Sequence, residues 1–90
     1  MTKATLNIVK DSFGQQVREL RRSLKLSQAQ LAARVASHQE FISDVERGEA
    51  NLTLDSIVRI ATALGVETID LFGATQRKTS SRKRSIKKKN

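Results

Sequence analysis

The residue types that most often carry catalysis or bind metals are scarce in this chain. It contains one histidine, His38, and no cysteine among its 90 residues. A disulfide and a thiolate metal site are therefore excluded, and a lone histidine rarely binds a metal. His38 also has no motif around it that would supply a nucleophile or a partner carboxylate in a pocket. We expect no enzyme activity, no metal and no cofactor.

The side chains best placed to do chemistry are hydrogen-bonding groups between residues 39 and 47. Phe41, Ile42 and Val45 are apolar at helical spacing and predict a buried helix face. The opposite face of the same helix then carries polar groups, which are Gln39, Glu40, Ser43, Asp44 and Arg47. This face can exchange hydrogen bonds with a partner, although any small bundle also has a solvated polar face.

The positive charge of the chain is concentrated at its C-terminus. The formal net charge is +8, and residues 74–90 contain eight lysines and arginines and no acid. Residues 1–73 contain nine bases and nine acids and are formally neutral. Because residues 74–90 are rich in charge and poor in apolar groups, we expect a disordered basic tail.

The elements that position the polar face are predicted to be helices. From Ser12 onward, Phe13, Val17, Leu20 and Leu24 recur at spacings of four and three, which places them on one helix face. No stretch has convincing strand character. The expected fold class is therefore all-α, a bundle of five short helices.

Capping signals predict where these helices begin. Serine followed three residues later by Gln or Glu occurs at Ser12–Gln15, Ser27–Gln30 and Ser37–Glu40. Thr53 begins a fourth helix that ends at Gly65, and residues 67–72 form a short fifth turn.

The predicted organisation has three parts. Residues 1–11 form a mobile arm or a short strand, residues 12–73 form one domain, and residues 74–90 form the tail. No apolar run approaches the roughly 18 residues that a membrane helix needs. We expect no membrane association and a cytoplasmic, nucleoid-associated protein.

Three blocks of sequence carry a family resemblance. LSQAQLA at 26–32, FISDVERG at 41–48 and NLTLDSIVRIATALGV at 51–66 resemble the Cro/repressor-type helix-turn-helix proteins, also called the XRE family. With flanking residues the resemblance covers roughly residues 13–72. It implies a lambda-repressor-like DNA-binding domain that acts as a transcriptional regulator and binds double-stranded DNA at a (pseudo)palindromic operator.

The resemblance also implies a site. In this family the third helix enters the major groove, and the base-reading positions here are Gln39, Glu40, Ser43 and Asp44. Gln39 can pair with adenine, and Glu40 or Asp44 can accept from cytosine. Asp44 is the weaker candidate, and its alternative role is to position Arg47 or Gln39. The expected phosphate contacts are Gln28, Arg34, His38, Arg47 and Asn51.

Two family features are structural. Arg21 and Glu46 match a pair that bridges the first and third helices.

The apolar residues after the fourth helix are too numerous for an exposed end, and we expect them to form a homodimer interface. They are Val66, Ile69, Leu71 and Phe72.

The chain departs from the family at the turn between its second and third helices. Ala36 and Ser37 stand where the family has Gly and an aliphatic residue. Ala36 would strain a left-handed backbone by about 1 kcal/mol, and Ser37 loses a core contact. The cap of the third helix is then either Ser37, by capping-box spacing, or His38, by alignment.

Several functional alternatives remain. Within the resembled family, a compact single-domain protein of this kind is similar to restriction–modification controller proteins, to small phage repressors and to antitoxins. We prefer the controller type. An antitoxin-type or adaptor protein with a protein partner is the second hypothesis. We expect no small-molecule effector. The tail makes nonspecific DNA contacts, serves as a nuclear-localisation-like address, or acts as a solubilising end; we prefer the first.

Overall fold

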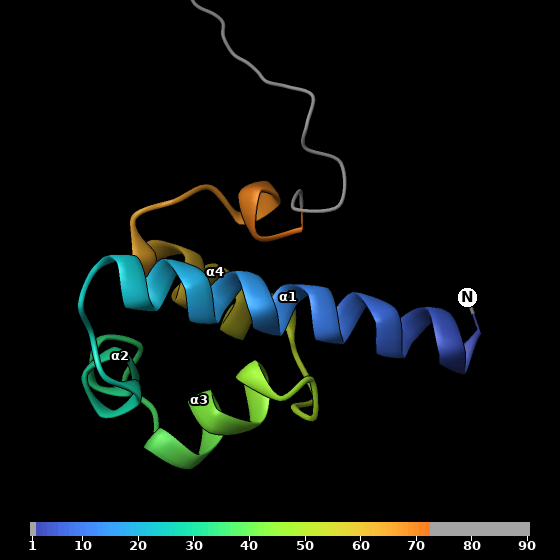
Figure 1. Cartoon of the computed structure of the whole chain (residues 1–90), viewed down its shortest axis with the longest axis horizontal. Coiled ribbons are helices and arrows are strands. Elements are labelled where there is room, and N and C mark those ends of the chain that lie inside the picture. The colour runs from blue at the N-terminus through green and yellow to red at the C-terminus, as the bar shows by residue number, and fades with distance from the viewer. Residues whose placement is uncertain (1, 73–90) are drawn as a thin grey trace, which may run out of the picture.

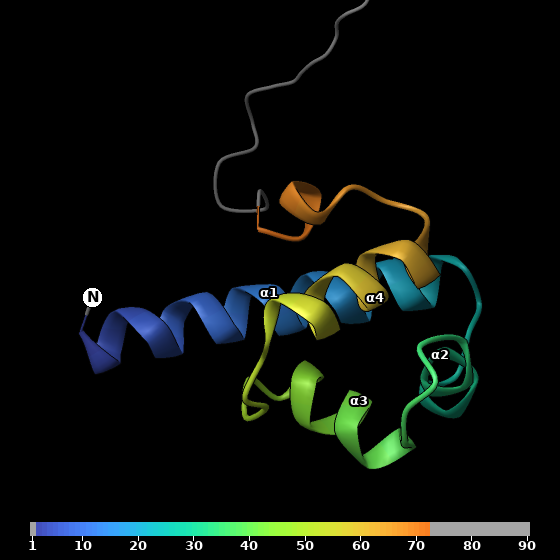
Figure 2. The same ribbon diagram turned by 180° about the vertical axis from the view of Figure 1, so that it is seen from behind.

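The computed structural model describes residues 2–72, and this part of the chain is all-α (Figure 1). The elements are α1 (Lys3–Ser23), α2 (Gln28–Arg34), α3 (Gln39–Glu46), α4 (Leu54–Leu64) and the 3-10 turn η1 (Thr68–Leu71). The predicted all-α fold class is confirmed, and residues 2–72 form four α-helices and one 3-10 turn. The helix α1 is long and lies between η1 and the α2–α3 pair, with α4 packed along its side (Figures 1 and 2).

No helix in this part of the chain is long and apolar enough to cross a membrane. The predicted basic tail lies outside the described residues.

The N-terminal segment differs from the prediction. Residues 3–11 form the first turns of α1, so the prediction of a mobile arm or strand over 1–11 is wrong for them. The helix is capped by Thr2, whose side chain accepts from the Thr5 N–H at 3.0 Å, and Ser12 lies inside the helix. The decisive pattern is Leu6, Val9 and Phe13, which recur at spacings of three and four.

Two of the predicted helix starts carry full capping boxes. Ser27 and Gln30 exchange side-chain and backbone hydrogen bonds at the start of α2. Thr53 does the same with Ser56 at the start of α4. The sequence allows either Ser37 or His38 as the cap of α3. The structure places His38 at the N-cap, without a side-chain capping bond.

The turn between α2 and α3 has a left-handed residue, as the resemblance implied. Ala36 has a φ of 56°, the Ala36 N–H donates to the Ala33 carbonyl at 3.2 Å, and the Ser37 N–H donates to the Ala32 carbonyl at 2.9 Å. This is a Schellman ending, which usually includes an apolar contact from the residue at position 37. The polar Ser37 stands at this position, and an open pocket of about 110 Å³ is lined by Ser37 and Phe41.

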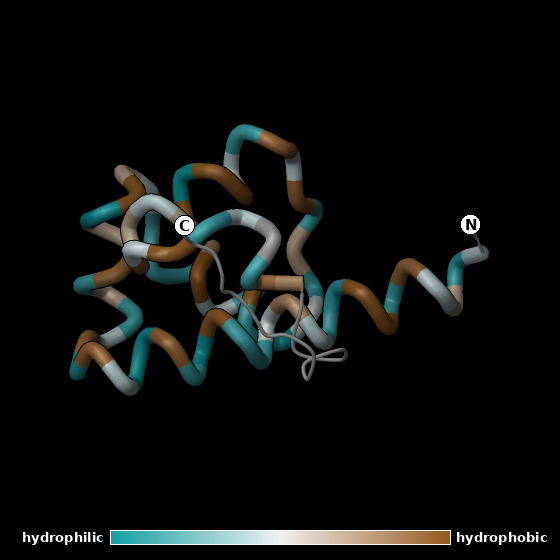
Figure 3. Tube along the Cα trace, turned by 90° about the horizontal axis from the view of Figure 1, so that it is seen from above, coloured by the Kyte–Doolittle hydropathy of each residue, from teal (hydrophilic) through white to brown (hydrophobic). Residues whose placement is uncertain are grey.

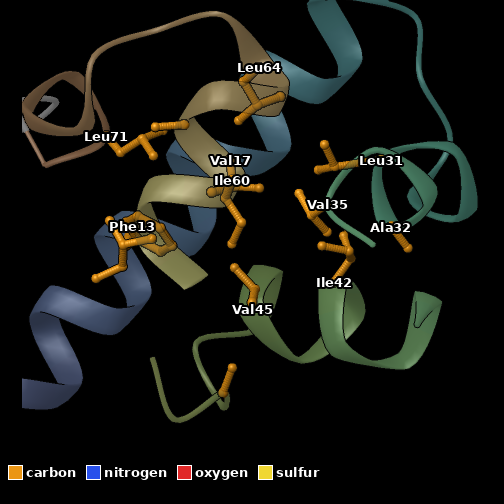
Figure 4. Packing of buried hydrophobic residues seen from close by; sticks show 13 residues of the cluster. Phe13, Val17, Leu31, Ala32, Val35, Ile42, Val45, Ile60, Leu64 and Leu71 are labelled. Atoms are coloured by element: carbon orange, nitrogen blue, oxygen red, sulfur yellow. The ribbon is translucent and has the colours of Figure 1, made fainter. Parts of the chain in front are cut away.

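Every helix contributes to one apolar core (Figure 4). The largest fully buried side chains are Phe13, Val17, Leu31, Ile42, Val45, Ile60 and Leu71. The ring of Phe72 covers one edge of this core, with its centroid 5.1 Å from that of Phe13. Because α2 and α3 bury residues in the same core, their relative orientation is fixed.

The approach of α1 to α3 depends on Gly14. A Cβ at this position would collide with the backbone carbonyl of Val45 and lie 3.0 Å from that of Glu46. The C-terminal end of α3 therefore lies directly against the backbone of α1. The local sequence around Gly14 gives no signal for this contact.

We predict that Gly14→Ala destabilises the domain by about 1–3 kcal/mol, because backbone atoms must move to make room for the methyl group. The sign is opposite to the gain of about 1 kcal/mol that alanine brings to an unobstructed helix. Gln15→Ala is the matched control, since residue 15 is the exposed neighbour in the same helix. Urea unfolding of the three proteins measures the difference; equal stability of Gly14→Ala and wild type would contradict the close approach.

Candidate nucleic-acid interface

The polar face of α3 is arranged as the sequence predicted. Ile42 and Val45 point into the core and are fully or almost fully buried. Gln39 and Glu40 are exposed at the first turn, and Ser43 is half-buried one turn later. The helix therefore presents hydrogen-bonding groups outward on a backbone that its inner face fixes.

The second half of this face is organised around Arg47. Its guanidinium donates to the Ser43 hydroxyl and forms an ion pair with Asp44. The Arg47 Nε also donates to Glu49 at 3.1 Å. Asp44 is thus bound to Arg47, which is the positioning role that the sequence left open for it. The single positive charge of Arg47 is shared between the carboxylates of Asp44 and Glu49 at this end of α3.

A buried ion pair lies behind the polar face. The Arg21 Nε donates to Glu46 Oε2 at 2.6 Å, and Arg21 Nη2 donates to Oε1 at 3.1 Å. The Glu46 side chain has no exposed surface. Arg18 adds a third contact from α1, with its Nε 3.4 Å from Glu46 Oε1. The predicted pair therefore bridges α1 and α3; Arg18, three residues before Arg21 on the same helix face, was missed.

The environment shifts both pKa values of this pair. Burial pushes the pKa of Glu46 upward, but hydrogen bonds from Arg21, Gln28 and Arg18 outweigh it, and the net pKa of Glu46 is lowered. The hydrogen bond to Glu46 raises the pKa of Arg21 despite its burial. Both side chains are therefore charged at neutral pH.

Gln28 connects this pair to the start of α3. Its Nε2 donates to Glu46 Oε1 at 3.0 Å, and its Oε1 accepts from Gln39 Nε2 at 3.5 Å. Gln28 is the first residue of α2 and Gln39 is the first residue of α3. The orientation of Gln39 is thereby coupled through one amide to the buried carboxylate.

The remaining predicted phosphate ligands are on the surface. Arg34 ends α2, His38 precedes α3 and Asn51 lies in the loop before α4, and all three are exposed. Asn51 Oδ1 accepts from Lys10 Nζ at 3.4 Å, a contact from α1 that the sequence did not indicate. Within residues 2–72, no group of three or more metal-ligating side chains comes together.

The predicted interface residues after α4 are only partly available. Leu71 is fully buried in the core of this chain, so its assignment to an interface is corrected: it is a core residue. Val66 and Phe72 are half-buried and pack against the same core. The side chain of Ile69 lies outside the described part of the structure. Other apolar side chains of the described residues are more exposed: Leu54 is 82% and Val58 is 52% exposed on α4, and Ile8 is 66% exposed on α1.

We predict that Glu46→Gln lowers the free energy of unfolding at pH 7 by about 3 kcal/mol, because the buried Arg21 loses its counter-charge. The folded pKa of Glu46 is depressed, so its contribution is fully present above the unfolded pKa of about 4.3 and is lost as pH falls through the folded pKa. Unfolding between pH 3 and 7 should therefore show a smaller acid loss in Glu46→Gln than in wild type.

Glu49→Gln is the control for this prediction. Glu49 pairs with Arg47 on the surface and is 64% exposed, so its removal should cost less than about 1 kcal/mol. Equal stability of the two variants across this pH range would show that the Glu46 pair does not stabilise the fold.

Comparisons with known proteins agree with this geometry. The helix-turn-helix family model HTH_3 matches residues 17–71. The chain is 44% identical over 70 residues to the control protein C.BamHI of Bacillus amyloliquefaciens, covering 77% of this chain and 86% of that protein. It is 39% identical over 64 residues to the control protein C.SmaI of Serratia marcescens, covering 71% and 76%.

A solved structure shares the fold as well as the sequence. The restriction–modification controller protein C.AhdI from Aeromonas hydrophila superposes with a TM-score of 0.68 at 41% identity, over 70% of this chain and 96% of that one. With α2, the turn and α3 in place, this chain belongs to the helix-turn-helix (XRE-type) family of DNA-binding transcriptional regulators.

Proposed function

We propose that this chain is a controller-type regulator that binds a (pseudo)palindromic operator as a homodimer and regulates its own expression. The observation that carries the proposal is that Gln28 connects the buried Glu46 to Gln39, whose side chain is exposed at the first turn of α3. The similarity to several control proteins supports this biological role over that of a general repressor. Such a regulator acts at DNA in the cytoplasm, and its control comes from its own concentration.

In this proposal α3 lies in the major groove and its outward face reads base edges. Gln39 offers both an amide donor and an acceptor, which match N7 and N6 of adenine. Glu40 can accept from the N4 group of cytosine, and Ser43 can contact either kind of base. Asp44 acts through Arg47, because the two side chains form an ion pair at the surface.

Residues around α3 contact the phosphates on both sides of the groove. Gln28 and the backbone N–H groups at the start of α2 face one strand, with Arg34 and His38 nearby. Arg47 and Asn51 flank the loop after α3 and face the other strand. These contacts set the position of α3 on the duplex and carry no sequence information of their own.

The dimer contact is proposed to lie on α4. Leu54 and Val58 are one turn apart on α4, and the half-buried Val66 follows soon after the helix ends at Leu64. Two exposed apolar side chains in one row favour a protein contact over water. A two-fold axis beside this apolar stripe (Leu54 and Val58) would relate two copies of α3, and the half-sites that they contact would lie about 34 Å apart.

We predict that the wild-type protein sediments as a dimer at tens of micromolar, and that Val58→Glu sediments as a monomer. The introduced charge would have to lose its water in an apolar contact, which costs several kcal/mol. Ile8→Glu is the control, since Ile8 is also exposed, at 66% against 52% for Val58, but lies on α1. A monomeric wild type that binds one half-site would contradict the proposed dimer, and a contact with an unrelated protein would then explain the stripe.

We also predict that Gln39→Ala weakens binding to the cognate operator by about 1–3 kcal/mol and relaxes the preference at one base position. Arg47→Ala should weaken binding to all duplexes similarly, because its proposed contact is to phosphate. Selection from a random duplex library gives the operator, and titrations on that operator and on random DNA compare the variants. Equal losses on both duplexes for Gln39→Ala would remove it from base reading.

A further inference from the structure

The N-terminal turns of α1 carry a line of polar side chains that lies outside the family match, which begins at residue 17. Lys3, Asn7 and Lys10 recur at spacings of four and three and therefore lie on one helix face. We propose that this basic ridge (Lys3, Asn7 and Lys10) contacts the DNA phosphate backbone beside the loop that follows α3. The proposal rests on the proposed function in that it needs α3 in the major groove.

Three contacts show which way the ridge faces. Gly14, four residues after Lys10, lies against the carbonyls at the C-terminal end of α3. Arg21, seven residues further along the same face, is bound to Glu46 at the end of α3. Lys10 itself donates to Asn51 in the loop between α3 and α4 at 3.4 Å. The ridge therefore continues the α1 face that is turned toward α3.

The ridge extends past the body of the domain. The N-terminal turns of α1 project beyond the other elements, as the views from the side and from above agree (Figures 1 and 3). Residues 2–8 are exposed. Lys3 and Lys10 are seven positions apart in the helix, which corresponds to about 10 Å along the axis. Lys10 is thus beside the loop that the proposed function places on one DNA strand, and Lys3 would lie about 10 Å further along that strand.

The chemistry of the ridge fits phosphate. Its two lysines are mobile point charges with several donors, and Asn7 between them adds an amide donor. Residues 1–10 contain no acid. Two apolar side chains of this segment are exposed, Ile8 at 66% and Leu6 at 41%. Ile8 is two residues from Lys10 and so points about 200° away around the axis, whereas Leu6, four residues from Lys10, borders the ridge. The ridge is therefore polar and basic, and a duplex backbone is the partner that it matches.

The test compares full-length wild type with Lys3→Ala/Lys10→Ala by titration of a selected operator and of a random duplex at several salt concentrations. Each lost phosphate contact reduces the slope of log K against log salt by about 0.9. We expect the slope to fall by about two per bound protomer on both duplexes, with the selected sequence unchanged.

A charge-relocated variant is the matched control. Lys3→Ala/Lys10→Ala/Thr5→Lys/Ile8→Lys has the same net charge but moves both lysines to the opposite face of the same segment. We expect its slope to equal that of the double alanine variant. A wild-type slope for this variant would mean that general positive charge acts, and would overturn the proposal.

Two further readouts separate the remaining explanations. Hydroxyl-radical footprinting should lose protection at the outer edge of each half-site in the double alanine variant; an identical footprint and slope would overturn the proposal. Sedimentation should be unchanged, and a weakened dimer would reassign the ridge to a subunit contact. If wild type does not distinguish the selected duplex from random DNA, the operator function fails, while the slope comparison still tests the ridge.

Discussion

The buried carboxylate of Glu46 is the group on which the arrangement of the proposed reading surface depends. Three helices meet at it: α1 through Arg18 and Arg21, α2 through Gln28, and α3 through Glu46 itself. Arg21 also donates from Nη1 to the Leu26 carbonyl at 2.8 Å, so the turn before α2 is fixed to the same group. A buried pair of this kind adds less stability than its distances suggest, but losing one partner is expensive. Its consequence here is geometric, since displacement of Glu46 would release Gln28 and with it Gln39.

This network requires the close approach of α1 to the end of α3. Gly14 allows the two backbones to touch, which brings Arg21, two turns later on the same face, within reach of Glu46. Gly48 has a φ of 76° and lies against Asp11, so the chain leaves α3 without moving away from α1. Both glycines therefore lie where α1 meets the C-terminal end of α3, Gly14 on α1 and Gly48 in the chain that follows α3. A side chain at Gly14 would separate the helices and lengthen the ion pair, whereas one at Gly48 would displace the Asp11 carboxylate and strain the left-handed backbone.

Much of this fold could be predicted from local sequence, and the exceptions have physical causes. The caps at Ser27 and Thr53 and the left-handed Gly65 are short-range signals, and each was located correctly. The start of α1 was misplaced because Ser12 and Gln15 have capping-box spacing, although the apolar period continues upstream through Leu6 and Val9. Leu71 was assigned to a surface because the sequence does not show that η1 folds back onto the core. Contacts between distant segments, such as those of Gly14 and of Lys10, have no local signal at all.

The distribution of charge explains why contacts outside the helix-turn-helix unit matter. The outward face of α3 carries Glu40 and Asp44, which repel phosphates, and Arg47 is shared between Asp44 and Glu49. The centre of the proposed interface therefore contributes discrimination between bases more than attraction to DNA. Residues 1–73 are formally neutral and the excess of eight positive charges belongs to residues 74–90, so attraction to DNA must come from positive groups outside the α3 face. In the proposed complex Arg34 would supply such a group beside α2, and the basic ridge of α1 would supply it beside the loop after α3. A reading helix that is acidic at its centre and flanked by bases would bind weakly wherever its base contacts are wrong, which would favour sequence selectivity over nonspecific affinity.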